Sequence, residues 1–396
     1  MTIMDPIPDR EGVLDLLRDS GWPRLSIYMP TGRPGSEAQK NQIRFKNRIQ
    51  EAAGGLIAGG MRTRQVQDFL APIRAMIDDQ RFWRYQADGL CMFQSPNSLR
   101  YFRLPRRVPE LTVVSKSYHI KPLLPLWSDQ MRCYLLSVDL REVDLFEVDA
   151  LGLRQVQLND DLPEGIEEFR PDEGDNGGLQ WHTGGEGERA TAGTPGETGP
   201  IYHGHGRGKD ASLEKERILA YLREVEDVVT RRVAGSEVPL ILAGVEYLLP
   251  LYREANHYPH VLPADLPVNT REMSEDDLHQ EALRLMQPLQ EQRRDELLER
   301  YRTMRPRQRT SRGIKDVLVA ATAGRVDTLW AQGEAYCWGR YDPATTQVDI
   351  HARQHPYDED LVNTAAVEAL KTQAQVLLAE PEQMPEEGKV AALLRY

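Results

Sequence analysis

The sequence predicts an α/β protein with three domains, and three observations support this prediction. The chain has 396 residues, which at roughly 150 residues per domain corresponds to two or three domains. Segments with helical and strand periodicity alternate in the last third, as they do in α/β sandwiches. A long glycine-rich stretch separates the strands and helices of the middle third. We place the domains at residues 1–129, 130–270 and 271–396.

The composition excludes several classes of protein. Sixty-one acidic and 49 basic residues give a net charge of −12, which disfavours a protein that coats nucleic acid through bulk positive charge. A hydrophobic content of 40% indicates a folded chain. The three cysteines are too distant for a disulfide framework or a Cys-x-x-Cys zinc site. No apolar run approaches the roughly 18 residues that span a bilayer, so we expect a cytoplasmic protein that contacts neither DNA nor a membrane.

In the first domain, the pattern predicts strands over residues 24–29, 89–94 and 111–116 and a helix over residues 40–56. Pro30 ends the first strand, because proline cannot donate to a sheet ladder. Four apolar residues of the helix lie loosely on one side and are expected to be buried: Ile43, Ile49, Ala53 and Leu56.

Three further strands open the second domain, over residues 134–139, 143–148 and 153–158, where apolar and polar residues alternate. Eight carboxylates against one arginine follow in residues 160–175, and such a run faces solvent. Residues 172–210 then hold twelve of the thirty glycines and almost no aliphatic residues. A loop of this length inside a compact domain is usually functional or disordered.

A strongly amphipathic helix is predicted after this loop, over residues 212–233. Ser212 is a suitable N-cap, and Gly235 lies just past the end. The apolar run at 239–245 predicts a buried strand. The residues expected on the buried face of the helix are Ile218, Leu222, Val225 and Val229.

The third domain begins with a capping box formed by Ser274 and Asp277, which starts a long helix towards Met304. Pro288 is expected to kink this helix. Alternating helix and strand segments follow at 313–323, 326–331, 348–350, 360–372, 376–378 and 391–396.

The most distinctive motif is His203-Gly-His-Gly-Arg-Gly-Lys209, between the glycine-rich loop and the helix. Its glycines let the backbone approach a ligand closely, and its imidazoles and cations suit phosphate or RNA. Asp210 follows where a phosphate-binding P-loop needs Ser or Thr. His203 and His205 have no third metal ligand at a fixed spacing, and a solvated tether is an open alternative for the whole motif.

Two local basic segments stand out from the acidic background. Residues 293–312 hold eight arginines against three acids, a balance of +5. The end of this segment, the arginine tail, either meets phosphates or is a solvated linker; it contains Arg305, Arg307, Arg309 and Arg312. The second, weaker patch contains Arg33, Lys40, Arg44, Lys46 and Arg48.

No catalytic nucleophile is recognisable. The sequence has no G-x-S-x-G elbow, no HExxH motif and no carboxylate pair typical of acid–base catalysis. Asp139 and Asp144 are interpreted as strand and turn residues. We expect no cofactor and no metal ion.

Several segments resemble, in this order along the chain, archaeo-eukaryotic class I peptide-chain release factors and Pelota, and most closely their bacterial, Balon-like branch. These segments are Ser115–Trp127, Arg132–Asp139, Leu240–Val245, Gly313–Trp330 and Val390–Tyr396. The resemblance implies an N-terminal domain at the decoding centre and an RNase H-like middle domain whose loop reaches the peptidyl-transferase centre. It also implies a C-terminal domain similar to ribosomal protein L7Ae.

The same resemblance implies a set of rRNA contacts. The loop at the peptidyl-transferase centre would comprise His203, Gly204, His205, Gly206, Arg207, Gly208, Lys209 and Asp210. On the decoding side, the contacts would come from Lys40, Asn41, Arg44, Lys46 and Arg48. The arginine tail would meet rRNA phosphates.

Two departures from the family pattern determine the expected function. Release-active members carry His-Gly-Arg-Gly-Gly-Gln, whereas in this sequence His-Gly-Arg-Gly is followed by Lys209 and Asp210. The carboxylate of Asp210 would disfavour the oxyanion that develops during hydrolysis of the peptidyl-tRNA ester. The first two positions of a stop-codon-reading element are Thr112 and Val114, which leaves Tyr118 as its single aromatic ring for stacking on a base.

We therefore expect a non-catalytic factor that occupies the ribosomal A site in idle or stressed ribosomes, with elongation factor Tu or another translational GTPase as partner. Two alternatives are open. One is a codon-independent rescue factor that hydrolyses peptidyl-tRNA with an imidazole base. The other is a protein–protein adaptor.

Overall fold

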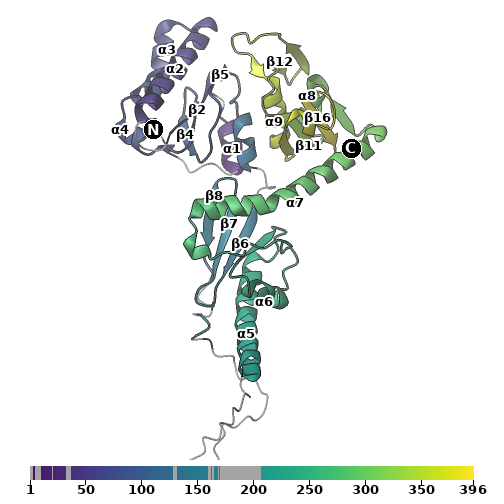
Figure 1. Cartoon of the computed structure of the whole chain (residues 1–396). Helices are drawn as coiled ribbons and strands as arrows, with labels where there is room; N and C mark the ends of the chain where they lie inside the picture. The colour runs from purple at the N-terminus through teal and green to yellow at the C-terminus, as the bar shows by residue number, and fades with distance from the viewer. Residues whose placement is uncertain are drawn as a thin grey trace, which may run out of the picture. The chain divides into compact units, whose positions relative to one another are not determined.

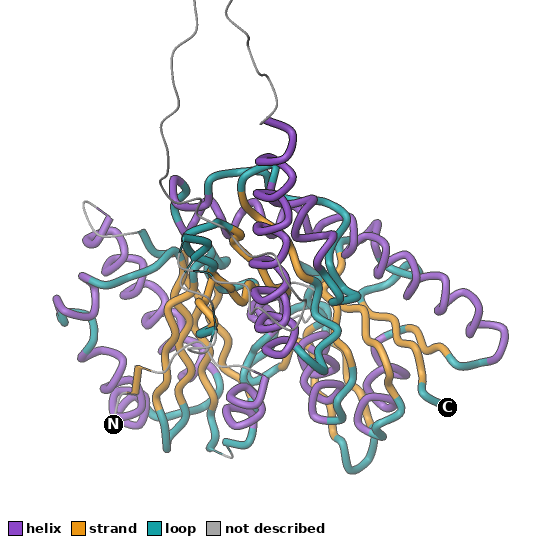
Figure 2. The backbone as a smooth tube through the Cα atoms, turned by 90° about the horizontal axis from the view of Figure 1, so that it is seen from below, coloured by secondary structure: helices purple, strands orange, loops and turns teal. Residues whose placement is uncertain are grey.

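The computed structural model describes residues 3–4, 10–19, 21–32, 37–127, 132–158, 162, 165–167, 169 and 207–396. The chain forms two compact units. The first unit comprises Met1–Arg132, Asp149–Gly152 and Met286–Tyr396, and the middle unit comprises Cys133–Val148 and Leu153–Leu285. Both contain sheets flanked by helices (Figures 1 and 2), so the α/β fold class is confirmed. The division into three domains stays a prediction. Within the described residues, no helix combines the length and apolar character that a bilayer crossing needs.

The N-terminal part of the first unit is built on a five-stranded sheet in the order β1-β4-β3-β2-β5. Its strands are β1 (Ile3–Met4), β2 (Arg24–Pro30), β3 (Gly89–Gln94), β4 (Leu99–Leu104) and β5 (Leu111–Ser115). Its helices are α1 (Arg10–Leu17), α2 (Glu37–Ala58), α3 (Thr63–Ala75) and α4 (Gln80–Arg84). The predictions of β2, β3, β5 and α2 are confirmed, and β4 is the antiparallel partner of β3 that the sequence pattern did not reveal.

The buried face of α2 differs from the predicted one. Ile43 is 61% exposed, whereas Phe45 is fully buried and lies against the ring of Trp83 at 5.3 Å between centroids. Starting from Phe45, the spacing of four, three and four residues leads through buried Ile49 and Ala52 to Leu56. The helix is therefore rotated relative to the prediction, because the large aromatic ring takes the core position.

The C-terminal part of the first unit contains two sheets, in the orders β10-β16-β11-β15 and β13-β12-β14. The first has β10 (Thr310–Arg312), β11 (Val326–Gln332), β15 (Gln375–Ala379) and β16 (Val390–Leu394). The second has β12 (Trp338–Asp342), β13 (Gln347–Ile350) and β14 (Glu359–Asp360). Helices α8 (Ile314–Thr322) and α9 (Leu361–Lys371) cover them. The alternation predicted for this part is confirmed, and β10, β12 and β14 are additional.

One hydrophobic core runs through both parts of the first unit. It joins Phe93 of β3 and Leu123 of the 3₁₀ helix η1 (Lys121–Trp127) to Leu361 and Ala365 of α9. The residues that link the N-terminal sheet to the rest of the chain are thus buried against the C-terminal part.

The long helix α7 (Glu275–Met304) begins as predicted. The Asp277 amide donates to Ser274 Oγ at 3.1 Å, which confirms the N-cap. Pro288 lies inside α7, and the helix continues past it to Met304.

The middle unit has a four-stranded sheet in the order β8-β7-β6-β9. Its strands are β6 (Cys133–Val138), β7 (Asp144–Asp149), β8 (Gly152–Val156) and β9 (Leu240–Gly244). Strand β6 pairs antiparallel with β7 and parallel with β9. At the end of β9, Gly244 has φ +154°, and a Cβ there would lie 2.4 Å from the Val138 carbonyl oxygen. Only glycine fits this approach of β9 to β6.

Helices α5 (Arg207–Val233) and α6 (Leu248–Ala255) pack together in the middle unit. All four predicted core residues of α5 are buried. Gly235, with φ +77°, follows the helix end as predicted. The predicted start is wrong, because α5 begins at Arg207 and Ser212 lies within it rather than at its N-cap.

Candidate functional site

The glycine-rich loop leads into the N-terminus of α5. His203, Gly204, His205 and Gly206 lie outside the described residues. Arg207, Gly208, Lys209 and Asp210 form the first turn of α5. Figure 1 shows this end of α5 extending beyond the strands of the same unit. Half of the expected loop residues are therefore on a regular helix.

The next turn of α5 is exposed on all sides. Residues 213–216 are exposed, including the apolar side chain of Leu213 at 63%. Burial begins with Ile218 and Leu219. The N-terminus of a helix carries free amide groups and a partial positive charge, which suit an anion such as phosphate.

The rest of α5 is held firmly in the middle unit. Arg217 donates through Nη2 to the Ile166 carbonyl. Glu226 is only 2% exposed, and its carboxylate accepts from the His257 amide at 2.9 Å and from Thr230 Oγ1 at 2.6 Å. These bonds satisfy a charge inside the unit and fix α5 against the segment after α6.

The expected decoding-side residues have partners within the protein. Asn41 is completely buried, and its Oδ1 lies 3.4 Å from the Gly32 amide nitrogen. Arg44 pairs with Glu110 at 2.8 Å, and Arg48 lies 3.6 Å from the same carboxylate. Lys40 and Lys46 are exposed on α2. Three of the five residues thus tie α2 to the rest of the fold.

The element at the position of the stop-codon reader is part of the core. Thr112 and Val114 lie in β5, and Tyr118 is fully buried. The Tyr118 hydroxyl donates to Asp19 Oδ2 at 3.2 Å, and burial raises the pKa of this phenol to about 12. Asp19 also accepts from Ser95 Oγ at 2.7 Å. The ring of Tyr118 is therefore not available for stacking on a base.

The arginine tail is folded rather than a linker, which corrects that alternative. Residues Arg305–Arg307 form a short 3₁₀ helix, and residues Thr310–Arg312 form β10, which pairs with β16. Arg305 and Arg312 both lie 3.4 Å from Glu386, and Arg309 donates to the Arg395 carbonyl. Arg307 is exposed. Arg305 and Arg312, which were expected to contact rRNA phosphates, are therefore paired with a carboxylate of the same chain.

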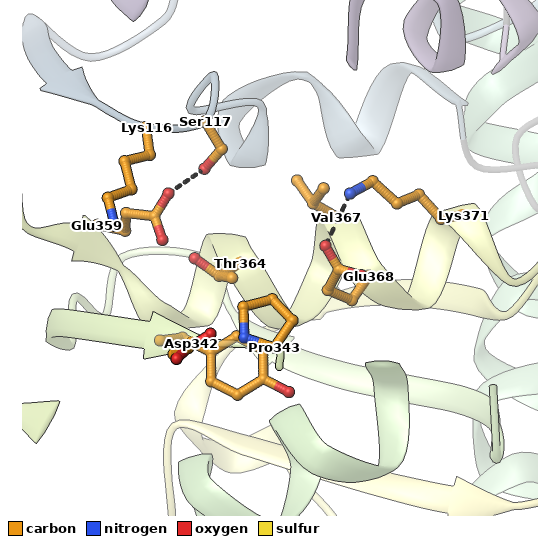
Figure 3. A pocket seen from close by; sticks show the side chains of 10 residues that line it. Lys116, Ser117, Asp342, Pro343, Glu359, Thr364, Val367, Glu368 and Lys371 are labelled. Atoms are coloured by element: carbon orange, nitrogen blue, oxygen red, sulfur yellow. Dashed lines mark hydrogen bonds and ion pairs between the residues drawn. The ribbon is translucent and has the colours of Figure 1, made fainter. Parts of the chain in front are cut away.

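A pocket of about 240 Å³ lies in the first unit, between the segment after β5 and helix α9 (Figure 3). Ser117 donates to Glu359 at 2.7 Å, and Lys371 pairs with Glu368 at 2.8 Å. Burial raises the pKa of Glu359. Ser117 and Glu359 thus join the two parts of the first unit across this pocket, whereas Lys371 and Glu368 pair within α9.

A buried ion pair lies at the same junction and was not visible in the sequence. Lys121 Nζ is 2.8 Å from Asp360 Oδ2, and both side chains are at most 1% exposed. Lys121 Nζ also donates to the Ala335 carbonyl at 2.5 Å. Burial lowers the pKa of Lys121, and the negative charge of Asp360 opposes that shift. The amide oxygen of Asn363 accepts from the Lys121 backbone at 3.0 Å. The two parts of the first unit are therefore joined by charge and by hydrogen bonds.

One model of a protein family matches the middle of the chain. Residues 133–288 match the model described as bacterial archaeo-eukaryotic release factor family 7. No curated protein matches the sequence.

Solved structures of a termination factor and of Pelota proteins cover much of the chain at low similarity. The archaeal translation termination factor aRF1 is 14% identical, with coverage of 99% of both chains and a TM-score of 0.23. Archaeal Pelota, from a model of ribosome-bound Pelota and ABCE1, is 16% identical, with coverage of 74% of this chain and 70% of Pelota and a TM-score of 0.35. Dom34 of S. cerevisiae is 11% identical, with coverage of 78% and 74% and a TM-score of 0.34.

The matched residues contain β6 to β9, α5, α6 and the whole glycine-rich loop at residues 172–210. The match confirms the resemblance noted in the sequence. Residues 133–288 of this chain are therefore similar to the bacterial archaeo-eukaryotic release factor family 7.

Proposed function

We propose that this protein is a ribosome-binding translation factor that occupies the A site of idle or stressed cytoplasmic ribosomes without hydrolysing peptidyl-tRNA. One observation carries the proposal. Inside the release-factor match, the His-Gly-Arg-Gly of the loop is followed by Lys209 and Asp210 instead of Gly-Gln.

The helical start of α5 supports a non-catalytic loop. Lys209 and Asp210 have helical backbone, so the chain at these positions is regular rather than free to fold around an ester. A carboxylate next to a developing oxyanion raises the barrier to hydrolysis, where a neutral amide would lower it. The cations and the helix N-terminus favour contact with phosphate groups of rRNA.

The surface of the first unit supports binding to ribosomal RNA without recognition of the codon bases. Tyr118 is buried, and Asn41 is used inside the fold. The exposed cations Lys40, Lys46 and Arg307 are suited to sequence-independent phosphate contacts. Pelota and Dom34 are described in complexes or interactions with ABCE1 and Hbs1, and we propose a translational GTPase, such as elongation factor Tu, as the corresponding partner here.

Co-sedimentation with 70S ribosomes tests binding. The full chain should pellet with vacant ribosomes, and its affinity should fall as the salt concentration rises. The variant Arg207→Ala/Lys209→Ala should bind more weakly, and the slope of log affinity against log salt should fall by about 1 for each phosphate that the variant no longer neutralises. Lys215→Ala is the matched control, because Lys215 is exposed two turns further along α5 and pairs with Glu254 at 3.4 Å. Absence of co-sedimentation, with and without the GTPase, would refute the proposal.

Release of formyl-methionine from programmed ribosomes tests catalysis. We expect no release by the wild-type chain. Release that is abolished in His205→Ala would instead establish the rescue activity, with an imidazole as base. The adaptor alternative is distinguished by deletion of residues 172–206, since an adaptor keeps its protein partner whereas a ribosome-bound factor loses affinity for the large subunit.

A further inference from the structure

The turn between β13 and β14 gathers two imidazoles and one carboxylate. His351 directly follows β13, and Asp358 directly precedes β14. Both strands pair with β12, so the ends of the turn are held on either side of one central strand. The His351 amide donates to the Trp338 carbonyl at 2.8 Å, which continues the ladder by one residue. One nitrogen or oxygen from each of His351, His355 and Asp358 lies within 4.8 Å of the others.

The carboxylate of Asp358 organises this cluster. Asp358 is completely buried, and its Oδ2 lies 2.7 Å from His351 Nδ1 and accepts from the His355 amide at 2.9 Å. Its Oδ1 lies 3.3 Å from Arg340 Nε on β12. With both oxygens engaged, Asp358 fixes the side chain of His351 and the backbone of His355. An imidazole that donates from Nδ1 to a carboxylate has its free lone pair on Nε2, the nitrogen that then binds a metal ion.

The outer side of the turn is anchored as well. Tyr357 has φ +64°, an unusual conformation for a residue with a side chain. Its ring packs against Trp22 at 5.0 Å between centroids and over Gly59, where a Cβ would lie 2.1 Å from the Tyr357 ring. The turn is thus held between the small sheet and the N-terminal part of the same unit.

The two rings are close and accessible. Their centroids are 4.5 Å apart, and the planes are inclined by 34°. The His351 side chain is 25% exposed, and His355 is exposed. Zinc binds imidazole nitrogen at about 2.0–2.1 Å, so His355, the more exposed of the two rings, has to adjust for both imidazoles to reach one ion.

We propose that His351 and His355 bind a divalent transition-metal ion, with Asp358 as the hydrogen-bond acceptor that orients His351. A carboxylate behind a metal-binding histidine is the usual arrangement at such sites, and imidazole selects zinc, copper or nickel over magnesium or calcium. Arg340 occupies the second oxygen of Asp358, which assigns the carboxylate to this outer role. Water or an external donor completes the coordination.

Titration of the tag-free, full-length chain with Zn²⁺ by calorimetry tests the site. We expect one ion bound per chain, with affinity at least tenfold weaker in His355→Ala. His355 is exposed and makes no core contact in the described structure, so this variant preserves the fold. Asp358→Asn should weaken binding by about 10- to 100-fold, as outer-sphere substitutions do. X-ray absorption of the loaded wild type should show imidazole ligation.

Two controls separate this site from other histidines. His260→Ala removes an exposed imidazole of the middle unit and should leave the affinity unchanged. His203→Ala/His205→Ala removes the imidazoles of the glycine-rich loop and should also leave it unchanged. Equal affinity of wild type and His355→Ala, loss of binding in the His203/His205 variant instead, or no Zn²⁺ binding by the wild type would each overturn the proposal.

Discussion

Replacement of Lys121 by methionine tests whether the buried ion pair holds the first unit together. The substitution removes the ammonium group that lies 2.8 Å from Asp360 and keeps most of the aliphatic volume. Asp360 is then left as a fully buried carboxylate without its cation. Breaking a buried pair in this way costs about 3–5 kcal/mol of unfolding free energy, because the remaining charge is uncompensated.

The surroundings of Asp360 place the expected cost at the lower end. Its Oδ1 also accepts from the Cys337 amide at 3.0 Å and from the Val362 amide at 3.2 Å, where it caps α9. These two bonds continue to stabilise the carboxylate after Lys121 is removed. We therefore expect a loss of about 3 kcal/mol in Lys121→Met, and a smaller loss in the charge-free double variant Lys121→Met/Asp360→Asn.

Urea unfolding of the full chain, followed by circular dichroism, measures this loss. Lys315→Met is the matched control, because Lys315 is exposed on α8 and its replacement should change stability by no more than about 0.5 kcal/mol. A Lys121→Met midpoint equal to that of Lys315→Met would refute the reasoning, since it would mean that water compensates Asp360 in solution.

Three other outcomes follow from the structure. Burial lowers the pKa of His119 to about 3 and keeps this imidazole neutral in the folded chain. Because the unfolded chain takes up a proton here below about pH 6.5, acidification from pH 7 to about pH 5 should lower the free energy of unfolding of wild type by about 2 kcal/mol more than that of His119→Phe. Urea midpoints of both proteins at both pH values measure this difference. Gly244→Ala should destabilise the middle unit, seen as faster amide exchange in β9, because its Cβ would meet the Val138 carbonyl at 2.4 Å; an unchanged exchange rate would contradict this. Asn41→Ala should lower the melting temperature, because it removes a buried side chain that bonds to Gly32, and loss of ribosome binding with unchanged stability would show instead that Asn41 contacts RNA.

Much of the local structure follows from the sequence pattern. The strands predicted over residues 134–139, 143–148 and 153–158 correspond to β6, β7 and β8, and the buried residues of α5 recur at helical spacing as predicted. Local pattern also misled at two points. On α2 the spacing favours Ile43, but Phe45 is the buried residue, and Ser212 is not an N-cap because α5 begins at Arg207 and runs through the glycine and charged residues before Ser212.

The interactions that join distant segments could not be predicted in this way. Lys121 and Asp360 are far apart in the sequence, and each alone has the appearance of a surface charge. His351, His355 and Asp358 are close in sequence, but their convergence depends on the left-handed conformation of Tyr357 and on the pairing of β12 with its two neighbours. The histidines of the glycine-rich loop lie outside the described residues, so their role in the candidate site stays a prediction.

The length of α5 determines how far its N-terminal end moves when the helix tilts. At 1.5 Å per residue, the 27 residues of this helix span about 40 Å. The first ten, from Arg207 to Glu216, extend about 15 Å past the point where Arg217 fastens the helix to Ile166. A helix transmits rotation as a stiff rod, so a tilt of about 10° at this fastening displaces the backbone of Lys209, about 12 Å away, by about 2 Å. Substitutions around Arg217, remote from any ligand at the tip, would therefore set how far the charged end of α5 reaches.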